Sequence, residues 1–270
     1  MAAAIEGAVV FDLDGTRLRW QMFHMWIKEM VAQGLLPQVV CTMAEKELEG
    51  YHNREAPFND WVSQQVRAYS GDNRMEGIRV EDVKFVARKV VREMGKRVHV
   101  FPQCLSEAAK ACGIRRAIIS GTPIEVVEAF ALADDISIYL GSELEKRGLD
   151  GMQRYTGRIE KEWVLDKCEA IHFLAEENGF VLKHSVAIGD SSSDALMLRE
   201  VEYPICFNPD QRLRNKAIEY GWPIVVERKD CIHMFRHSGP RNIQLLNLSD
   251  FLPEGLAAAM AQLLPPGSIV

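Results

Sequence analysis

Three short apolar runs, separated by stretches with helical periodicity, restrict the fold of this chain more than any other feature. The runs cover residues 8–11, 117–119 and 186–188. Short runs rich in β-branched residues and bounded by turn residues are typical of buried parallel strands. Helical stretches between such strands are typical of α/β proteins. The sequence therefore predicts an α/β fold with a Rossmann-like, doubly wound parallel sheet.

Each of the three runs is followed closely by polar residues. Asp12 and Asp14 come after the first run, Ser120 after the second, and Asp190 after the third. Because parallel strands run in the same direction, their carboxyl ends lie at one edge of the sheet, where open α/β folds bind ligands. We therefore expect these four side chains to converge on one site.

The α/β pattern stops after the first run and resumes near residue 97. Residues 17–96 are predicted to form an inserted helical cap, because apolar residues recur there at helical spacing and β-branched runs are few. The α/β core is expected to comprise residues 1–16 and 97–227, and residues 228–270 a C-terminal extension packed on the core or on a second subunit. Among the predicted helices are those over residues 60–69, 80–94, 161–178 and 256–264.

Charge and composition restrict the partners of this chain. A net charge of −6 gives no support for binding to nucleic acid or to an anionic membrane surface. No segment is apolar enough over the length of a bilayer, and the first residues lack the basic start and apolar core of a signal peptide. The cysteines are scattered without a Cys-x-x-Cys pair, which favours a reduced setting. We expect a cytoplasmic monomer or homodimer.

The pair Asp12 and Asp14 can supply two chemical roles at the end of a strand. Gly15 permits a sharp turn that brings the second carboxylate back over the first. One aspartate can then act as a nucleophile that forms an aspartyl-phosphate, and the other as a proton donor and acceptor. Clustered carboxylates repel each other, so the site needs a hard cation, and Asp12 with Asp190 and water would suit Mg²⁺.

Ser120, Gly121 and Thr122 are predicted to form a phosphate-binding loop at the start of a helix. Thr122 would cap that helix, and Glu125 would close a capping box. The loop would then present backbone N–H groups and a hydroxyl to a phosphate at a helix N-terminus. Lys167, which opens a later helix, could pair with the phosphate and hold the nucleophile ionised.

Four ordered motifs of this chain resemble those of the haloacid dehalogenase superfamily. They are Asp12-Leu-Asp14-Gly15-Thr16, Ile119-Ser120-Gly121-Thr122, Lys167, and Gly189-Asp190-Ser-Ser-Ser-Asp194. The lysine precedes Asp190 by 23 residues, as in phosphoserine phosphatase-like members. The resemblance covers residues 8–227 and implies that residues 17–96 are a C1-type cap. It also implies that Ser120 and Lys167 bind the phosphoryl oxygens of a substrate.

The same resemblance implies a mechanism for the four aspartates. Asp12 would attack phosphorus, and Asp14 would protonate the leaving alcohol and then activate the water that hydrolyses the aspartyl-phosphate. Mg²⁺ would be held by the carboxylates of Asp12 and Asp190 and by the backbone carbonyl of Asp14. Asp194 would support the metal shell. The expected activity is Mg²⁺-dependent hydrolysis of a small phosphomonoester.

The chain departs from phosphoserine-selective members where those members contact the substrate. Nine positions after the nucleophile, where they carry an acidic residue for the substrate ammonium, this chain has Gln21. The cap arginine that binds the serine carboxylate aligns with Gln65, and Ser191 and Ser193 replace the usual glycine and asparagine of the fourth motif. We therefore expect Gln21 to face the substrate, and the substrate to be a small phosphorylated metabolite other than phosphoserine.

Other interpretations of these residues stay open. A phosphomutase would use the same aspartyl-phosphate and return the phosphoryl group to a sugar, and a non-catalytic protein would only bind a phosphorylated ligand. Arg17 and Arg19 could attract a second anionic group or lie in a solvated flap. The cap aromatics could form the core of the cap or line a pocket. His172 and His184 show no ligand-like partners and are expected to be ordinary surface or boundary residues.

Overall fold

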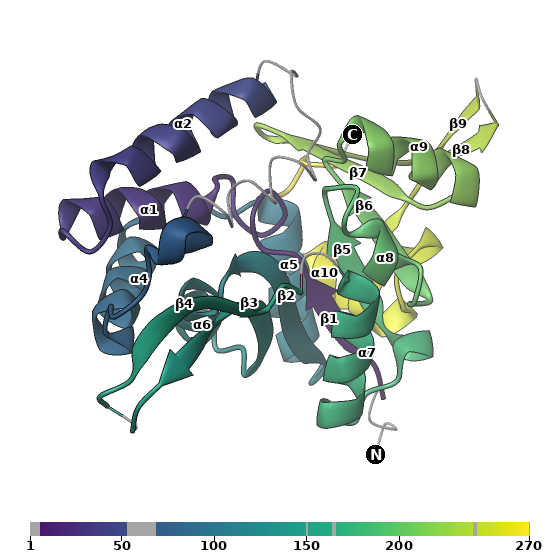
Figure 1. Cartoon of the computed structure of the whole chain (residues 1–270). Helices are drawn as coiled ribbons and strands as arrows, with labels where there is room; N and C mark the ends of the chain where they lie inside the picture. Colours follow the sequence, from purple (N-terminus) through teal and green to yellow (C-terminus); the bar gives the residue numbers. More distant parts are fainter. Residues whose placement is uncertain (1–5, 53–68, 150, 164–165, 240–241, 270) are drawn as a thin grey trace.

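The computed structural model describes residues 6–52, 69–149, 151–163, 166–239 and 242–269. Within these residues the strands form one nine-stranded sheet with the order β4-β3-β2-β1-β5-β6-β7-β8-β9 (Figure 1). Its six parallel strands are β3 (Ile138–Arg147), β2 (Arg115–Pro123), β1 (Ala8–Phe11), β5 (Val186–Gly189), β6 (Tyr203–Phe207) and β7 (Ile224–Arg228). The strand order changes direction between β1 and β5. This is the topological switch point at which open sheets bind ligands.

Side chains of β1 alternate between the two faces of the sheet, and helices cover both faces. Val9 and Phe11 pack with α5 (Val100–Ala111) and α10 (Glu254–Leu263). Ala8 and Val10 pack on the other face with α7 (Lys167–Asn178), α8 (Ala195–Leu198) and α9 (Gln211–Tyr220). Because every residue of β1 is buried, this strand is apolar throughout, as parallel strands covered on both faces generally are. The predicted α/β fold with a doubly wound sheet is confirmed.

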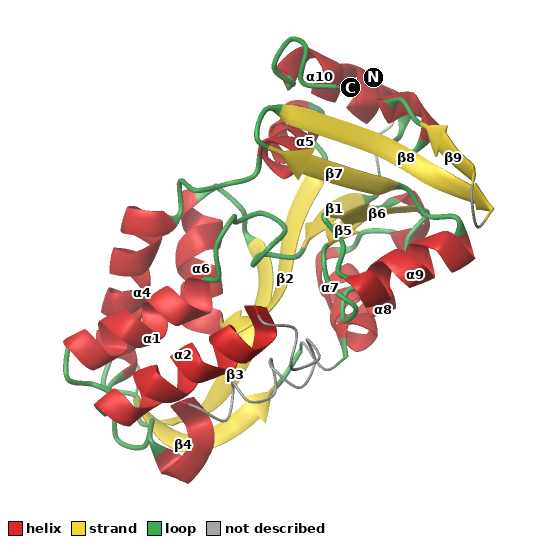
Figure 2. Cartoon of the chain, turned by 90° about the horizontal axis from the view of Figure 1, so that it is seen from above, coloured by secondary structure: helices red, strands yellow, loops and turns green. Residues whose placement is uncertain are grey.

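The segment after β1 forms helices that gather to one side of the sheet (Figure 2). They are α1 (Met22–Ala32), α2 (Gln38–His52), the short 3-10 helix η1 (Gly71–Asn73) and α4 (Val80–Met94). Trp26 and Tyr69 are fully buried among them, with ring centroids 5.4 Å apart at a near-perpendicular angle. The same hydrophobic core continues into α6 (Ile124–Ala133) and reaches Tyr155. These aromatics therefore form the interior of the helical segment rather than a pocket wall.

One strand, β4, replaces part of the predicted pattern between β3 and α7. The helix predicted over residues 161–178 begins only at Lys167, because Asp166 caps it by accepting the N–H of Glu169. Residues Arg154–Lys161 instead form β4, which pairs antiparallel with β3. The helix predicted over residues 60–69 lies almost entirely outside the described residues.

The C-terminal residues extend the sheet as well as adding a helix. β8 (Cys231–Gly239) pairs antiparallel with β7, and β9 (Asn242–Leu245) pairs with β8. The helix predicted over residues 256–264 is present as α10, which packs on α5 through Leu256 and Met260. None of the helices among the described residues has both the length and the apolar character that a bilayer crossing requires.

Glu227 at the end of β7 holds the start of α5. Its carboxylate accepts the N–H groups of Val100 at 3.0 Å and Phe101 at 2.8 Å, which are free donors at the helix N-terminus. Arg19 and His99 contact the same carboxylate at 3.0 and 3.2 Å. Burial raises the pKa of Glu227, but these hydrogen bonds outweigh that effect and hold it below its ordinary value. The Glu227 carboxylate therefore holds the start of α5, where the chain leaves the helical segment, against the end of β7 in the sheet.

Glu227→Gln should lower the free energy of unfolding at neutral pH by about 1–2 kcal/mol, because a buried charged acceptor at a helix N-terminus is lost. A group whose folded-state pKa is depressed contributes stability above its ordinary pKa and loses it as the pH falls. The difference between variant and wild type should therefore shrink below pH 4.5, the ordinary value for this carboxyl. Urea unfolding of both proteins at several pH values measures this difference in the free energy of unfolding. As a control, Glu177→Gln on the exposed face of α7 should change the free energy of unfolding little. An equal penalty for Glu227→Gln at all pH values would contradict this account.

Candidate active site

Four aspartates at the carboxyl edge of the sheet form a group that we call the acid cluster: Asp12, Asp14, Asp190 and Asp194. Asp12 follows β1, Asp190 follows β5, and Asp194 immediately precedes α8. Carboxylate oxygens of Asp12, Asp190 and Asp194 all lie within 4.8 Å of one another. The structure thus brings together carboxylates that are almost 180 residues apart in the sequence.

Glycine at two positions makes this close approach possible. Gly15 has a φ of +86°, and a Cβ atom there would lie 2.2 Å from a carboxylate oxygen of Asp190. A Cβ atom at Gly189 would lie 2.5 Å from the carboxyl carbon of Asp194. Any side chain at either position would therefore push the carboxylates apart.

Lys167 joins two of the carboxylates by ion pairs. Its Nζ lies 2.7 Å from Oδ1 of Asp12 and also donates to Oδ1 of Asp194. The lysine side chain is only 2% exposed. Burial alone would lower the pKa of Lys167, but the two carboxylates raise it above its ordinary value. Lys167 therefore stays charged and offsets part of the negative charge around Asp12.

Asp194 shapes the loop that carries Asp190. Its Oδ2 accepts the N–H groups of Asp190 at 3.0 Å and Ser191 at 2.8 Å, and the hydroxyl of Ser191 at 2.8 Å. The Ser191 hydroxyl also lies 2.9 Å from that of Ser193. Both carboxylate oxygens of Asp194 thus already have partners, whereas the Asp190 carboxylate accepts a longer, 3.3 Å hydrogen bond from the hydroxyl of Thr16. Asp190 is better placed than Asp194 to contact a cation directly.

Asp14 is held by two donors from different segments. Its Oδ1 accepts the N–H of Met22 at 2.7 Å, and its Oδ2 accepts the hydroxyl of Thr122. Burial raises the pKa of Asp14 to about 6, although both hydrogen bonds oppose this rise. A carboxyl with a pKa in this range can give and take a proton near neutral pH.

Thr122 has a different role from the one predicted. The helix begins at Ile124 with Pro123 as its N-cap, so the predicted capping box of Thr122 and Glu125 does not form. The Thr122 hydroxyl binds Asp14, and Glu125 lies 2.9 Å from Lys146. Sequence analysis missed this contact because a threonine before a helix is more often its cap.

Ser120 and Gly121 lie in the last part of β2, in the segment that carries Thr122. Ser120 is buried, and its hydroxyl oxygen accepts the N–H of Thr122 at 3.1 Å. The carbonyl of Gly121 accepts the hydroxyl of Ser142 at 2.7 Å. Through Thr122 this segment contacts Asp14, so it borders the acid cluster.

Gln21 is half-buried and forms the N-cap of α1, directly before the Met22 N–H that binds Asp14. Gln65 lies outside the described residues. Arg17 is fully buried, with its guanidinium 2.5 Å from Asp134 and 2.9 Å from Gln103. The hypothesis that Arg17 attracts a second anionic group is therefore wrong, because its charge is used inside the protein. Arg19 binds Glu227 instead of projecting as a free flap residue.

The charge of the acid cluster suits a divalent cation. Burial raises the pKa of Asp12 to about 7, Asp194 and Asp14 add to the rise, and Lys167 opposes it. Burial and the neighbouring carboxylates raise the pKa of Asp190 well above its ordinary value. The acid cluster offers an ion carboxylate oxygens, which are the ligands that hard cations prefer. A bound cation would also neutralise the repulsion between these carboxylates. The residues present can therefore hold a metal ion.

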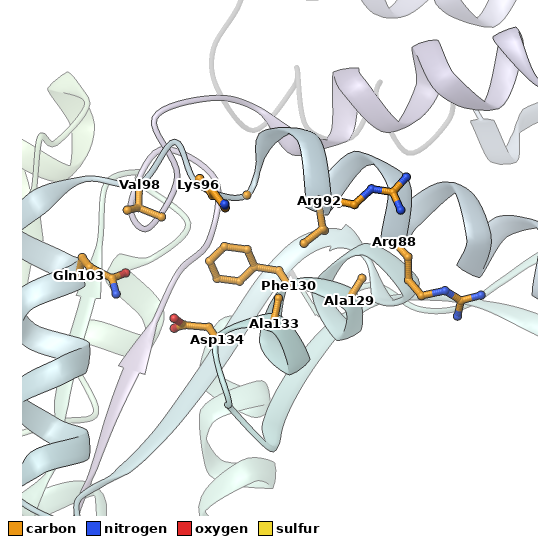
Figure 3. Close-up of a pocket in the computed structure, with 11 residues that line it drawn as sticks. Arg88, Arg92, Lys96, Val98, Gln103, Ala129, Phe130, Ala133 and Asp134 are labelled. Carbon is orange, nitrogen blue, oxygen red and sulfur yellow. The ribbon is translucent and has the colours of Figure 1, made fainter.

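A separate cavity of about 700 Å³ lies between α4 and α6 (Figure 3). Phe130 and Asp134 line it from α6 and the end of that helix, and Arg92 and Lys96 from α4 and the segment that follows it. Its volume would accommodate a small molecule. The acid cluster, Ser120 and Lys167 are absent from its described lining, so it is not the site formed at the strand ends.

Comparison with known proteins agrees with this geometry. Residues 9–199 match the family model described as haloacid dehalogenase-like hydrolase. The probable phosphatase Rv3661 of Mycobacterium tuberculosis is 28% identical over 234 residues, which cover 81% of this chain and 74% of that protein. A histidinol-phosphatase of Neisseria meningitidis is 25% identical, over 82% of this chain and 99% of that protein.

Solved structures share the fold at lower identity. A protein of unknown function from Bordetella pertussis has a TM-score of 0.64 at 22% identity, covering 80% of this chain and 96% of the other. A phosphoserine phosphatase described as a phospho-aspartyl intermediate analogue has a TM-score of 0.55 at 19% identity, covering 83% of this chain and 94% of the other. Because the family model matches well over half of its residues, and its sheet carries the family's ordered motifs, the chain belongs to the haloacid dehalogenase-like hydrolases.

Proposed function

We propose that this protein is a Mg²⁺-dependent phosphatase that hydrolyses a small phosphomonoester through an aspartyl-phosphate on Asp12. One observation supports this most strongly: the buried Asp12 carboxylate lies 2.7 Å from the charged Lys167, within 4.8 Å of Asp190. The phosphatase names of several relatives agree with the proposal. The substrate would be a soluble metabolite, and the setting would be cytoplasmic.

Asp12 is proposed as the nucleophile, and Lys167 as the group that keeps it ionised. The lysine contacts Oδ1 of Asp12, which leaves Oδ2 to attack phosphorus. The attack forms an O–P bond on Asp12 and breaks the bond between phosphorus and the substrate oxygen. The positive charge of Lys167 would also stabilise the negative charge on the transferring phosphoryl group.

Asp14 is proposed as the proton carrier for both half-reactions. In its protonated form it would give its proton to the departing alcohol, and as a carboxylate it would then take a proton from the water that attacks the aspartyl-phosphate. Thr122 and the Met22 N–H fix the orientation of this carboxyl. Since its pKa is raised to about 6, both protonation states are accessible near neutral pH.

Asp12, Asp190 and the backbone carbonyl of Asp14 would hold the Mg²⁺, with Asp194 orienting the loop that carries Asp190. When bound, the ion would neutralise carboxylate repulsion and polarise the phosphoryl group. Ser120 and Gly121 would contact phosphoryl oxygens from the end of β2. We assign the leaving-group side of the substrate to Gln21, which follows the nucleophile by nine residues.

The central test of this proposal is hydrolysis of an aryl phosphate. Wild-type protein with Mg²⁺ should release phosphate, and Asp12→Asn should lower kcat by about three orders of magnitude or more, since a nucleophile is lost. Removal of Mg²⁺ with a chelator should abolish turnover reversibly. Asp230→Asn, which alters an exposed aspartate between β7 and β8, is the matched control and should keep wild-type activity. Turnover retained by Asp12→Asn would contradict the mechanism.

Substrate choice gives a second test, centred on Gln21. A neutral amide cannot pair with an ammonium group as a carboxylate can, so phosphate esters of uncharged alcohols should have a higher kcat/KM than phosphoserine. Gln21→Glu should raise kcat/KM for phosphates of amino alcohols roughly tenfold, as one charge-assisted hydrogen bond would. The same variant should change hydrolysis of an uncharged ester little. Efficient hydrolysis of phosphoserine by the wild-type protein would contradict this assignment.

A further inference from the structure

We propose that Cys168, His172 and Glu200 form a second metal site, one that binds a thiophilic divalent cation such as Zn²⁺. One ligand atom from each of these side chains lies within 4.8 Å of the other two. His172 Nε2 and Glu200 Oε2 are 2.9 Å apart. His172 lies at the surface as expected, but the expectation that it has no ligand-like partners is wrong. The signal was present in the sequence, because Cys168 and His172 are four residues apart on one helix and share a face.

The three ligand atoms could coordinate a tetrahedral ion after a small adjustment of their side chains. Zinc bonds of about 2.0–2.3 Å to nitrogen, oxygen and sulfur place ligand atoms roughly 3.2–3.6 Å apart. The His172 and Glu200 atoms, 2.9 Å apart, are a few tenths of an ångström closer than that range, so a bound ion would move them slightly apart. The Cys168 sulfur, which lies within 4.8 Å of both, would rotate toward them. Three protein ligands leave a fourth position for water, as in zinc sites that are not purely structural.

The donor set distinguishes this site from the acid cluster. Sulfur, imidazole nitrogen and a carboxylate select a borderline-soft ion, whereas the carboxylate oxygens of the acid cluster select a hard one. On binding, the Cys168 thiol would release its proton to solvent and bind as a thiolate. The thiolate and the Glu200 carboxylate together carry the charge that balances a divalent cation. His172 and Glu200 are partly exposed, with side-chain exposures of 49% and 24%, so an ion can reach them from solvent.

The second metal site lies on the same two segments that carry Lys167 and Asp194 of the proposed active site. Cys168 and His172 lie on α7, which begins with Lys167, and Glu200 follows α8, which Asp194 precedes. Lys167 and Asp194 are themselves ion-paired. A cation bound by the three ligands would therefore link the two segments that hold this ion pair in position, and should raise the thermal stability of the protein.

The test is a titration of the whole reduced protein with Co²⁺. Excess Mg²⁺ is present so that it, and not Co²⁺, occupies sites built from oxygen ligands alone. One equivalent should bind with a thiolate-to-cobalt charge-transfer band and the visible bands of tetrahedral Co²⁺, and Zn²⁺ should displace it. Cys168→Ala should abolish the charge-transfer band. His172→Ala and Glu200→Gln should each weaken binding by more than about tenfold, since even changes outside the ligand shell cost that much.

Two matched variants separate this site from other thiols and imidazoles. Cys231→Ala removes an exposed cysteine on β8, and His184→Ala removes an exposed histidine, and both should bind Co²⁺ as the wild type does. Asp12→Asn should also keep the bands, so the outcome is independent of the proposed phosphatase activity. Thermal unfolding without metal checks that each variant is folded. Absence of a thiolate band in the wild type, or its persistence in Cys168→Ala, would overturn the proposal.

Discussion

The ion pairs of Lys167 with Asp12 and Asp194 are the interactions on which the rest of the site depends. The three groups come from the start of α7, the end of β1 and the residue before α8, so the contact fixes three elements at one point. Burying a charge is costly unless it is paired, and removing one partner of such a pair leaves the other uncompensated. The core must therefore hold these elements in register before the aspartates can do any chemistry.

The position of the acid cluster follows from topology and from chain geometry together. The order of the sheet reverses between β1 and β5, which leaves room at their carboxyl ends. Gly15 then lets the chain turn tightly enough for Asp190 to approach, and Asp14 is turned toward Met22 and Thr122. The helical segment begins directly after this turn. Its first helix therefore contributes a backbone donor to the cluster, so the fold of that segment is coupled to the orientation of Asp14.

Sequence reasoning predicted the central strands and the convergence of their polar ends, because buried parallel strands are short, apolar and followed by ligand-binding loops. It did not predict β4 or the hairpin of β8 and β9, since these antiparallel strands at the two ends of the sheet lack the continuous apolar runs of the buried parallel strands. The contacts of Thr122 and Arg17 were missed for a different reason. Both depend on partners more than a hundred residues away, Asp14 and Asp134, whose proximity only the tertiary structure reveals. The His172 pairing with Glu200 is of the same kind, because it joins two separate helical segments.

The most direct measurement of the central claim is a crystal structure of the protein grown with Mg²⁺ and beryllium fluoride, a mimic of a phosphoryl group bound to a carboxylate. If Asp12 is the nucleophile, a fluoroberyllate group should be bonded to one of its carboxylate oxygens, beside Lys167, with the cation contacting Asp12 and Asp190. An adduct on another residue, or a cation bound away from Asp12 with its carboxylate unmodified, would show that Asp12 is not the nucleophile.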